Sequence, residues 1–281
     1  MNSIVLTAAR LLFLLSFLGM LPENMKTQNF ITTHLEVNTG KLENPVRIAV
    51  LSDLHLYEYG PDNADLVRAV HDEQPDLITV LGDMVIKKNP EYGSVITLCR
   101  QLTEIAPVYY VHGNHEYDNI TKLSSRIGED LRAAGVQVLD SEWRTITVNG
   151  NSIDIAGIPR GPRRYNWTDQ VMMADYLQSP DFRLLLLHDP GFYDPRITTN
   201  PDITLIGKPI DVVLCGHRHG GQIDIPLVGG MFHPDVGFFP NLTFGDNLVG
   251  KTHVIVSRGL SDHNGLPRLN NPYELLIITL K

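Results

Sequence analysis

Short apolar runs alternate with amphipathic segments along the chain from about residue 45. The apolar runs are rich in β-branched residues, as is typical of strands buried on both faces, and they cover residues 45–51, 76–81 and 107–111. The segments after them repeat their apolar residues with helical spacing, and they cover residues 62–73, 92–105 and 120–134. This strand–helix order predicts parallel strands joined by helical crossovers.

The pattern changes after about residue 140. Two alternating segments flank Asn149-Gly150, a pair that favours the tight turn of a β-hairpin. A short helix is expected at residues 172–177. Further strands are expected at residues 182–187, 211–215, 253–257 and 274–280, the last two as antiparallel closing strands. The two halves predict an α/β fold in which a two-sheet mixed β-sandwich is flanked by helices, in one domain over residues 45–281.

The N-terminal segment differs from the rest in composition. Residues 4–21 are apolar except for Thr7, Arg10 and Ser16, and Arg10 precedes a run that is almost entirely Leu and Phe. This pattern predicts an apolar helix in residues 1–22 that acts as a membrane anchor or a signal segment, with an amphipathic cap helix as a third alternative. Residues 23–44 are expected to form a polar linker and an edge strand.

Charge and cysteine content exclude some classes of protein. The formal net charge of −9 argues against nucleic acid as a partner, because a phosphate backbone requires a basic footprint. A small phosphorylated substrate stays compatible with this charge, since bound metal cations would dominate the local field. Cys99 and Cys215 both lie in apolar runs, which favours buried free thiols over a disulfide.

Residues that can bind metal ions follow five of the apolar runs. They are Asp53 and His55, Asp83, Asn114 and His115, His188, and His217 and His219. One such aspartate alone would be a turn residue, and one such histidine a packed core residue. Five strand ends together predict a shared site, because ligands bind beyond the carboxyl ends of strands in α/β sheets. Carboxylates, an amide and imidazoles suit Mn²⁺, Fe or Zn²⁺, and two ions that share one carboxylate would use the whole set.

The pattern Asp-x-His, Gly-Asp, Gly-Asn-His-Glu, His and Gly-His-x-His resembles the calcineurin-like metallophosphoesterase superfamily, and the resemblance runs from about Val46 to Leu280. Residues 220–222, 257–260 and 272–275 are similar to its membrane-associated bacterial branch. That branch includes YkuE/YaeI-like phosphodiesterases and enzymes of lipid A biosynthesis that hydrolyse UDP-2,3-diacylglucosamine. The resemblance implies a metallophosphoesterase catalytic domain in residues 45–281 and a location at the bacterial inner membrane. Residues 157–160 depart from the branch, in which an acidic pair is expected.

The resemblance also implies a role for each residue of the set. Asp53, His55 and His219 would hold a first divalent ion. Asn114, His188 and His217 would hold a second, and Asp83 would bridge the two. A hydroxide between the ions would attack phosphorus in line, without a covalent intermediate. His115 would stabilise charge or protonate the leaving oxygen, and Glu116 would orient it.

The expected function is therefore hydrolysis of a phosphodiester or pyrophosphate bond in a phosphorylated small molecule or lipid, with UDP-2,3-diacylglucosamine as one candidate and residues 4–21 at the membrane. A broad phosphomonoesterase and a non-catalytic metal- or phosphate-binding scaffold are the alternatives. Two further groups are open to two interpretations each. Arg160, Arg163 and Arg164 could clamp a phosphate or belong to a solvated loop. Phe232, Phe238, Phe239 and Phe244 could meet acyl chains or a membrane, or pack beneath a long loop.

Overall fold

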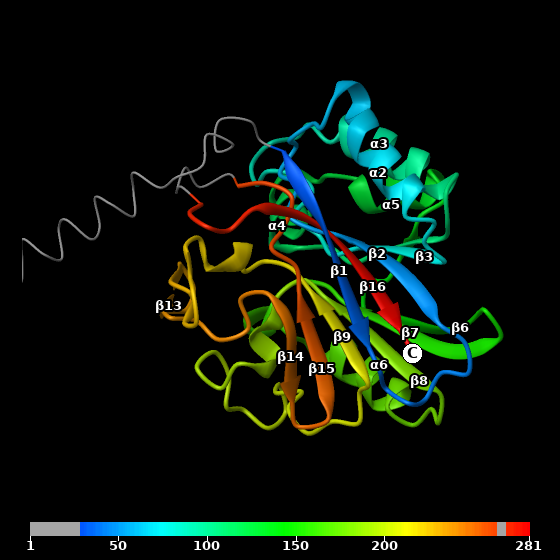
Figure 1. The fold of residues 1–281 in the computed structure, drawn as a ribbon, viewed down its shortest axis with the longest axis vertical. Helices are drawn as coiled ribbons and strands as arrows, with labels where there is room; N and C mark the ends of the chain where they lie inside the picture. The colour runs from blue at the N-terminus through cyan, green and yellow to red at the C-terminus, as the bar shows by residue number, and fades with distance from the viewer. Residues whose placement is uncertain (1–28, 263–267) are drawn as a thin grey trace, which may run out of the picture.

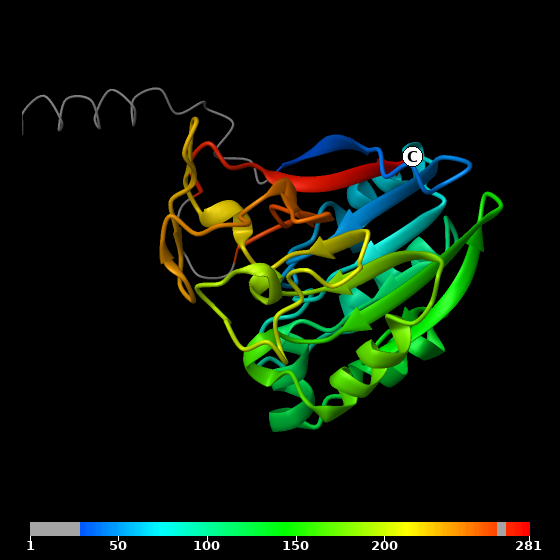
Figure 2. The ribbon, with the colours of Figure 1, turned by 90° about the horizontal axis from the view of Figure 1, so that it is seen from below.

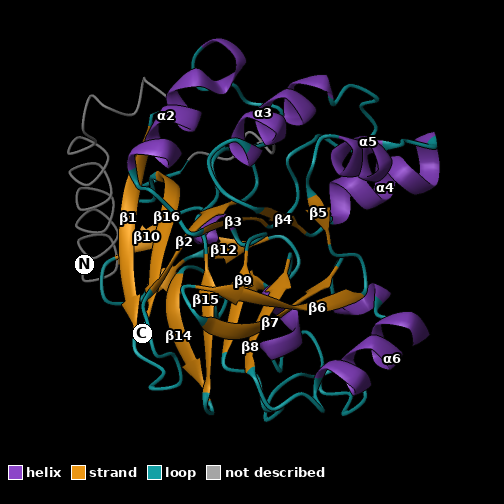
Figure 3. Cartoon of the chain, turned by 90° about the vertical axis from the view of Figure 1, so that its right-hand side faces the viewer, coloured by secondary structure: helices purple, strands orange, loops and turns teal. Residues whose placement is uncertain are grey.

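Two mixed β-sheets pack face to face and carry helices on their outer sides. The computed structural model describes residues 29–262 and 268–281. Figure 2 shows the strands as two layers, and Figure 3 shows α2, α3, α4 and α5 on one outer face and α6 on the other. This arrangement confirms the predicted α/β sandwich flanked by helices.

The first sheet has the strand order β1-β16-β2-β3-β4-β5. Its strands are β1 (Phe30–Val37), β2 (Val46–Leu51), β3 (Leu77–Val80), β4 (Val108–Tyr110), β5 (Gln137–Val138) and β16 (Tyr273–Leu280). The strands from β2 to β5 are parallel, whereas β16 runs antiparallel to β2 and parallel to β1 (Figure 1). Crossovers are made by α2 (Ala64–Asp72), α3 (Gly93–Thr103), α4 (Asn114–Leu123) and α5 (Ile127–Ala133).

The second sheet has the order β14-β15-β9-β8-β7-β6. Its strands are β6 (Glu142–Val148), β7 (Asn151–Ile158), β8 (Phe182–Leu187), β9 (Val212–Cys215), β14 (Gly245–Val249) and β15 (Thr252–Val256). The parallel strands are β7, β8, β9 and β15, and α6 (Trp167–Tyr176) connects β7 to β8. Asn149 and Gly150 have φ angles of 51° and 83°, so they form the predicted tight turn between β6 and β7.

Two small hairpins follow β9 and project from one side of the sandwich (Figures 1 and 2). They pair β10 (Asp224–Ile225) with β11 (Gly229–Gly230), and β12 (Phe232–His233) with β13 (Gly237–Phe238). Short 3-10 helices lie at η2 (Pro61–Asn63), η3 (Pro162–Arg164), η4 (Pro190–Tyr193) and η5 (His219–Gly221).

One detail of the predicted fold is wrong. The helix expected over residues 120–134 is interrupted at Ser124, whose φ of 54° ends α4. Ser125 follows it and accepts a hydrogen bond from the Ile127 amide at 3.4 Å, so the local serine chemistry competes with helix continuation although the apolar periodicity runs on. Both closing strands have an antiparallel neighbour, as predicted, and they lie in different sheets: β16 pairs antiparallel with β2, and β15 pairs antiparallel with β14 and parallel with β9.

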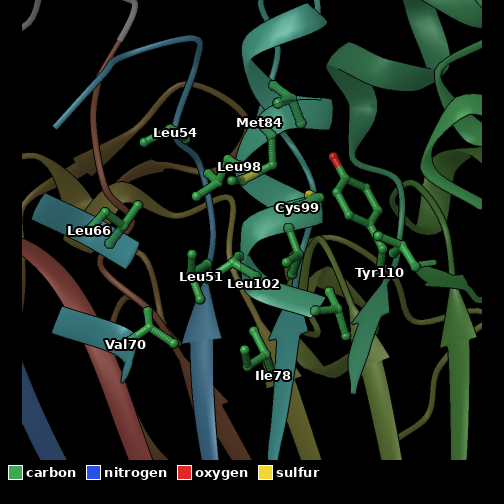
Figure 4. Packing of buried hydrophobic residues seen from close by; sticks show 14 of the residues in the cluster. Leu51, Leu54, Leu66, Val70, Ile78, Met84, Leu98, Cys99, Leu102 and Tyr110 are labelled. Atoms are coloured by element: carbon green, nitrogen blue, oxygen red, sulfur yellow. The ribbon is translucent and has the colours of Figure 1, made fainter. Parts of the chain in front are cut away.

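Buried side chains fill three layers. Between the sheets, Ile48 and Val50 meet Leu184 and Leu214. Outside the first sheet, Leu66 and Val70 lie one helical turn apart on α2 and pack with residues of α3 and β2 (Figure 4). Each such side chain contributes about 1.5–3 kcal/mol of burial free energy. These layers fix the strands whose ends carry the predicted metal ligands.

The predicted apolar helix in residues 1–22 lies outside the described residues. Among residues 29–262 and 268–281, no helix has both the length and the apolar character needed to cross a membrane. Strand β1 covers residues Phe30–Val37, where an edge strand was expected, and it lies at the edge of the first sheet.

Candidate metal centre

The predicted metal ligands lie together at one rim of the sandwich. They come from the segments directly after β2, β3, β4, β8 and β9. The two sheets meet here through backbone contacts: the Leu260 amide, after β15, donates to the Ser52 carbonyl at 2.9 Å, and the Arg160 amide, after β7, donates to the His112 carbonyl at 3.0 Å. A Cβ at Gly216 would lie 1.8 Å from Ser52 Oγ, so only glycine allows this approach.

The backbone at this rim is strained. Asp53, Asp83, His217 and His219 have φ angles of 55°, 52°, 70° and 48°, in the left-handed region that non-glycine residues rarely occupy. The surrounding hydrogen bonds hold these conformations, among them one from the His217 amide to Asp53 Oδ2 at 2.9 Å. Strain of this kind concentrates at functional sites, where the fold positions side chains at a cost in stability.

The first group of potential ligands contains Asp53, His55 and His219. One ligand atom from each lies within 4.8 Å of the others, and all three residues are buried. Burial lowers the pKa of His55 to about 3, so its imidazole is neutral, as a metal ligand must be. Burial alone would raise the pKa of Asp53, but nearby His219 and His188 outweigh it and lower that pKa.

The second group contains Asp83, His188 and His217, again with one ligand atom each within 4.8 Å. His188 donates from Nδ1 to the Leu81 carbonyl at 2.7 Å. Its Nε2 therefore faces Asp83 Oδ2 at 3.2 Å and Asn114 Oδ1 at 3.1 Å. Burial opposes charge on His188, but Asp83 outweighs this effect and raises the pKa of His188 to about 10.

The arrangement of these donors fits divalent cations. Asp83 also lies within 4.8 Å of His55, so this carboxylate is shared between the two groups. Asp53 Oδ1 is buried and accepts no hydrogen bond from any residue in the described ranges, which is costly unless a cation faces it. Buried carboxylates and imidazoles that converge in this way are the ligands of Mn²⁺, Fe and Zn²⁺.

His115 stands on the wall of the same site. Its Nε2 lies 3.7 Å from Asp83 Oδ2, and its Nδ1 faces two backbone groups. The Lys87 amide donates to Nδ1 at 3.1 Å, which leaves the proton of the neutral ring on Nε2. The Val85 carbonyl, 3.2 Å from Nδ1, accepts a hydrogen bond from this nitrogen when it carries a proton.

Glu116 has a different role from the predicted one of orienting the His115 ring. Its carboxylate accepts hydrogen bonds from the amides of Asp83, Met84 and Gly113 at 2.8, 2.8 and 3.0 Å, and from Tyr110 Oη at 2.8 Å. Four donors saturate the carboxylate, so Glu116 holds the loops after β3 and β4 together. It therefore supports Asp83 and His115 through the backbone.

A cavity of about 360 Å³ opens from this rim to solvent. Five of the predicted site residues line it, Asp83, Asn114, His115, His217 and His219, together with the cationic side chains of Lys87, Arg163 and Arg164.

Arg160 lies away from the cavity and does not belong to this group of cations. Its side chain is buried and pairs with Asp169 at 3.3 Å. The phosphate-clamp interpretation is therefore left to Arg163 and Arg164.

The structure adds residues that the sequence analysis missed. Asp262 Oδ1 lies 3.1 Å from His219 Nδ1, and Asp235 Oδ2 lies 3.0 Å from His217 Nε2. Asp189 and His233 also line the cavity. The sequence His233-Pro234-Asp235 could have been noticed as a polar cluster in an apolar loop, but its distance from His217 along the chain gives no sign of contact.

The phenylalanines after the Gly-His-x-His motif divide into two kinds. The Arg258 guanidinium stacks over the Phe244 ring at 3.5 Å, so Phe244 packs inside the loop. Phe238 and Phe239 are 67% and 54% exposed. Leu227 and Val228 are also exposed, on the neighbouring hairpin.

A sandwich of two mixed sheets with two groups of metal ligands that share a carboxylate defines a dinuclear metallohydrolase. The Calcineurin-like phosphoesterase family matches residues 46–221, and the chain belongs to this family. It is therefore a metallophosphoesterase, a metal-dependent hydrolase of phosphoric esters, and this family uses a dinuclear metal centre.

Relatives support this assignment. Phosphodiesterase YaeI of Escherichia coli is 29% identical, over 84% of this chain and 82% of its own length. The uncharacterized metallophosphoesterase YkuE of Bacillus subtilis is also 29% identical, over 84% of this chain and 79% of its own. The crystal structure of TT1561 from Thermus thermophilus shares the fold with a TM-score of 0.50 at 15% identity, over 78% of this chain and 91% of that one.

Proposed function

We propose that the chain hydrolyses a phosphodiester or pyrophosphate bond at two divalent ions, Mn²⁺, Fe or Zn²⁺. Asp53, His55 and His219 would hold one ion, and Asn114, His188 and His217 the other. The position of Asp83 carries this proposal: its carboxylate lies within 4.8 Å of His55 in the first group and of His188 and His217 in the second, as a bridging carboxylate must. The name of the relative YaeI, a phosphodiesterase, supports the choice of a diester.

The side chains are prepared for this chemistry. Two bound cations would lower the pKa of water and offset charge on the phosphoryl oxygens. Asp83 stays ionised, since His188 and His115 outweigh the effect of burial and hold its pKa well below the ordinary value. His115 lines the cavity and would donate a hydrogen bond from Nε2 that offsets charge on the leaving oxygen, or would protonate that oxygen from its imidazolium form. Lys87, Arg163 and Arg164 bind the anionic substrate.

The proposed substrate is lipid-linked, with UDP-2,3-diacylglucosamine as the candidate, and residues 4–21 would tether the chain to the inner membrane. Exposed Phe238 and Phe239 support this proposal, because they lie at the end of the hairpin whose residues His233 and Asp235 line the cavity. Apolar side chains beside a polar catalytic cavity match a substrate with acyl chains next to its phosphates.

The test uses the full chain in detergent. It is loaded with Mn²⁺, Fe or Zn²⁺ and assayed on bis-p-nitrophenyl phosphate, p-nitrophenyl phosphate and UDP-2,3-diacylglucosamine. Asp83→Asn and His115→Ala should each lower kcat by at least about 10²-fold. Asp246→Asn and His253→Ala are matched controls, because this carboxylate–histidine pair joins β14 and β15 in the second sheet. Their kcat should equal that of the wild type.

Each substrate separates one alternative. Activity on the monoester alone would refute the diesterase proposal, and inactivity of every metal form would favour a binding scaffold. The double variant Phe238→Ser/Phe239→Ser should lower kcat/KM for the diacylated substrate but not for bis-p-nitrophenyl phosphate. An equal loss on both substrates, or no loss on either, would refute the lipid-linked substrate.

A further inference from the structure

We propose that Asp235 is a positioning residue for the metal ligand His217, so that the β12–β13 hairpin controls the affinity for one ion of the pair. This inference rests on the proposed dinuclear centre. Asp235 lies in the turn between β12 and β13, and its Oδ2 is 3.0 Å from His217 Nε2. Its side chain is 43% exposed, and the Arg163 guanidinium approaches its other oxygen at 3.9 Å.

The contact fixes which nitrogen of His217 can bind an ion. An imidazole that donates its Nε2 proton to a carboxylate keeps its lone pair on Nδ1. Asp235 therefore selects the tautomer that leaves the Nδ1 lone pair for an ion, and His217 is grouped with Asp83 and His188 as a potential ligand. A carboxylate in this position also makes the imidazole a stronger ligand and restrains its rotation.

The same hairpin holds the His217 backbone. His233 is buried, and its Nε2 donates to the His217 carbonyl at 3.0 Å. The Asp235 amide in turn donates to His233 Nδ1 at 3.3 Å. Residues of one hairpin thus hydrogen-bond both the ring and the carbonyl of His217. These contacts restrain a residue whose φ of 70° is strained.

A third metal ion is the alternative explanation of this cluster, since His217, His233 and Asp235 bring ligand atoms within 4.8 Å of one another. Both ring nitrogens of His233 are already engaged with backbone groups, so neither has a lone pair directed at an ion. The cluster is consequently a support for His217 and not a separate cation site.

The experiment measures Mn²⁺ binding to the full chain in detergent after chelation, by isothermal titration calorimetry. The wild type should bind two ions. Asp235→Ala should weaken one of the two sites by about 10- to 100-fold and leave the other unchanged. Asp235→Asn keeps an oxygen acceptor, so its affinity at the weakened site should lie between those of the wild type and Asp235→Ala. Asp246→Asn is the matched control, because it neutralises a carboxylate–histidine pair of similar length, 2.9 Å, between β14 and β15.

A second measurement separates positioning from folding. Electron paramagnetic resonance of Mn²⁺-loaded protein should show a coupled pair in the wild type and mostly isolated ions in Asp235→Ala at limiting metal. Two sites of wild-type affinity in Asp235→Ala would overturn the inference and leave the proposed function intact. The inference would also be overturned if the wild type bound three ions and Asp235→Ala lost one of them. A wild type that binds fewer than two ions would refute the dinuclear centre itself. If Asp235→Ala fails to fold, Asp235→Asn decides by the same measurements.

Discussion

Replacing Gly113 by alanine would push apart the two loops that carry Asp83 and His115. Gly113 has φ −84° and ψ −171°, a conformation that alanine adopts freely, so backbone strain plays no part in this change. The added Cβ would lie 2.2 Å from Asp83 Oδ1 and 2.6 Å from the Asp83 amide nitrogen. Ordinary contact requires about 3.5 Å, so the loops must separate by roughly 1 Å.

The hydrogen bonds of Glu116 oppose this movement. Its Oε2 accepts from both the Asp83 and the Gly113 amides, at 2.8 and 3.0 Å, and cannot follow both when they part. Overpacking costs about 1–3 kcal/mol, and a buried hydrogen bond left unmade costs about 1–3 kcal/mol more. Gly113→Ala should therefore lose about 2–6 kcal/mol of unfolding free energy. A displacement of about 1 Å in Asp83 should also lower kcat by about 10²-fold.

Urea unfolding of the full chain without metal measures the first effect, and metal content after loading measures the displacement of Asp83. Gly93→Ala is the matched control, because a Cβ at this first residue of α3 meets nothing within 4 Å. It should stabilise the chain by about 0.4–1 kcal/mol. Wild-type stability and two bound ions in Gly113→Ala would show that the loops accommodate the methyl group, and the steric reasoning would be refuted.

Three further results are expected. Asp169→Ala should cost about 3–5 kcal/mol of unfolding free energy, because it leaves Arg160 buried without its carboxylate partner. Removal of the exposed Asp65 beside Arg68 should cost under about 1 kcal/mol. Equal losses of the two variants in urea unfolding would contradict this. Burial raises the pKa of the Cys99 thiol to about 12, so Cys99 should react with a disulfide reagent at pH 8 only after unfolding. The raised pKa does not change the unfolding free energy below the unfolded thiol's pKa of about 8.5, and it lowers the unfolding free energy as pH rises above that value. Reaction of Cys99 in the folded protein, or a rise of stability in this pH range, would refute the burial of the thiol. Arg163→Ala should raise KM about tenfold with kcat unchanged, while Arg126→Ala, whose pair with Glu129 is exposed, should change neither; an equal fall in kcat would assign Arg163 to the transition state.

The apolar runs predicted the strands well, because a strand buried on both faces leaves an unambiguous pattern. Polar residues directly after such a run must lie at the strand end, so the rim that holds Asp53, Asp83 and His188 follows from local sequence. Strand β14 was missed because it is an edge strand with alternating exposure, and its Gly-Asp-Asn start resembles a turn.

Contacts set by the path of a loop could not be predicted in this way. Asp235 reaches His217 only because two short hairpins fold back over the rim, and no periodicity encodes that return. The role of Glu116 was wrong for a related reason. Adjacency in sequence indicated the His115 ring, whereas the helical start of α4 turns the carboxylate toward the amides of Asp83 and Met84.

The position of β16 between β1 and β2 has a consequence for synthesis of the protein. Strand β1 comes early among the described residues, yet the strand it pairs with there is β16, the last of the described strands to be made. Until β16 emerges from the ribosome, one edge of β2 and all of β1 expose unpaired backbone groups that can pair with other chains. The first sheet is therefore complete only after β16 has been made, and a nascent chain that stalls before residue 273 should be held by chaperones and degraded readily by proteases.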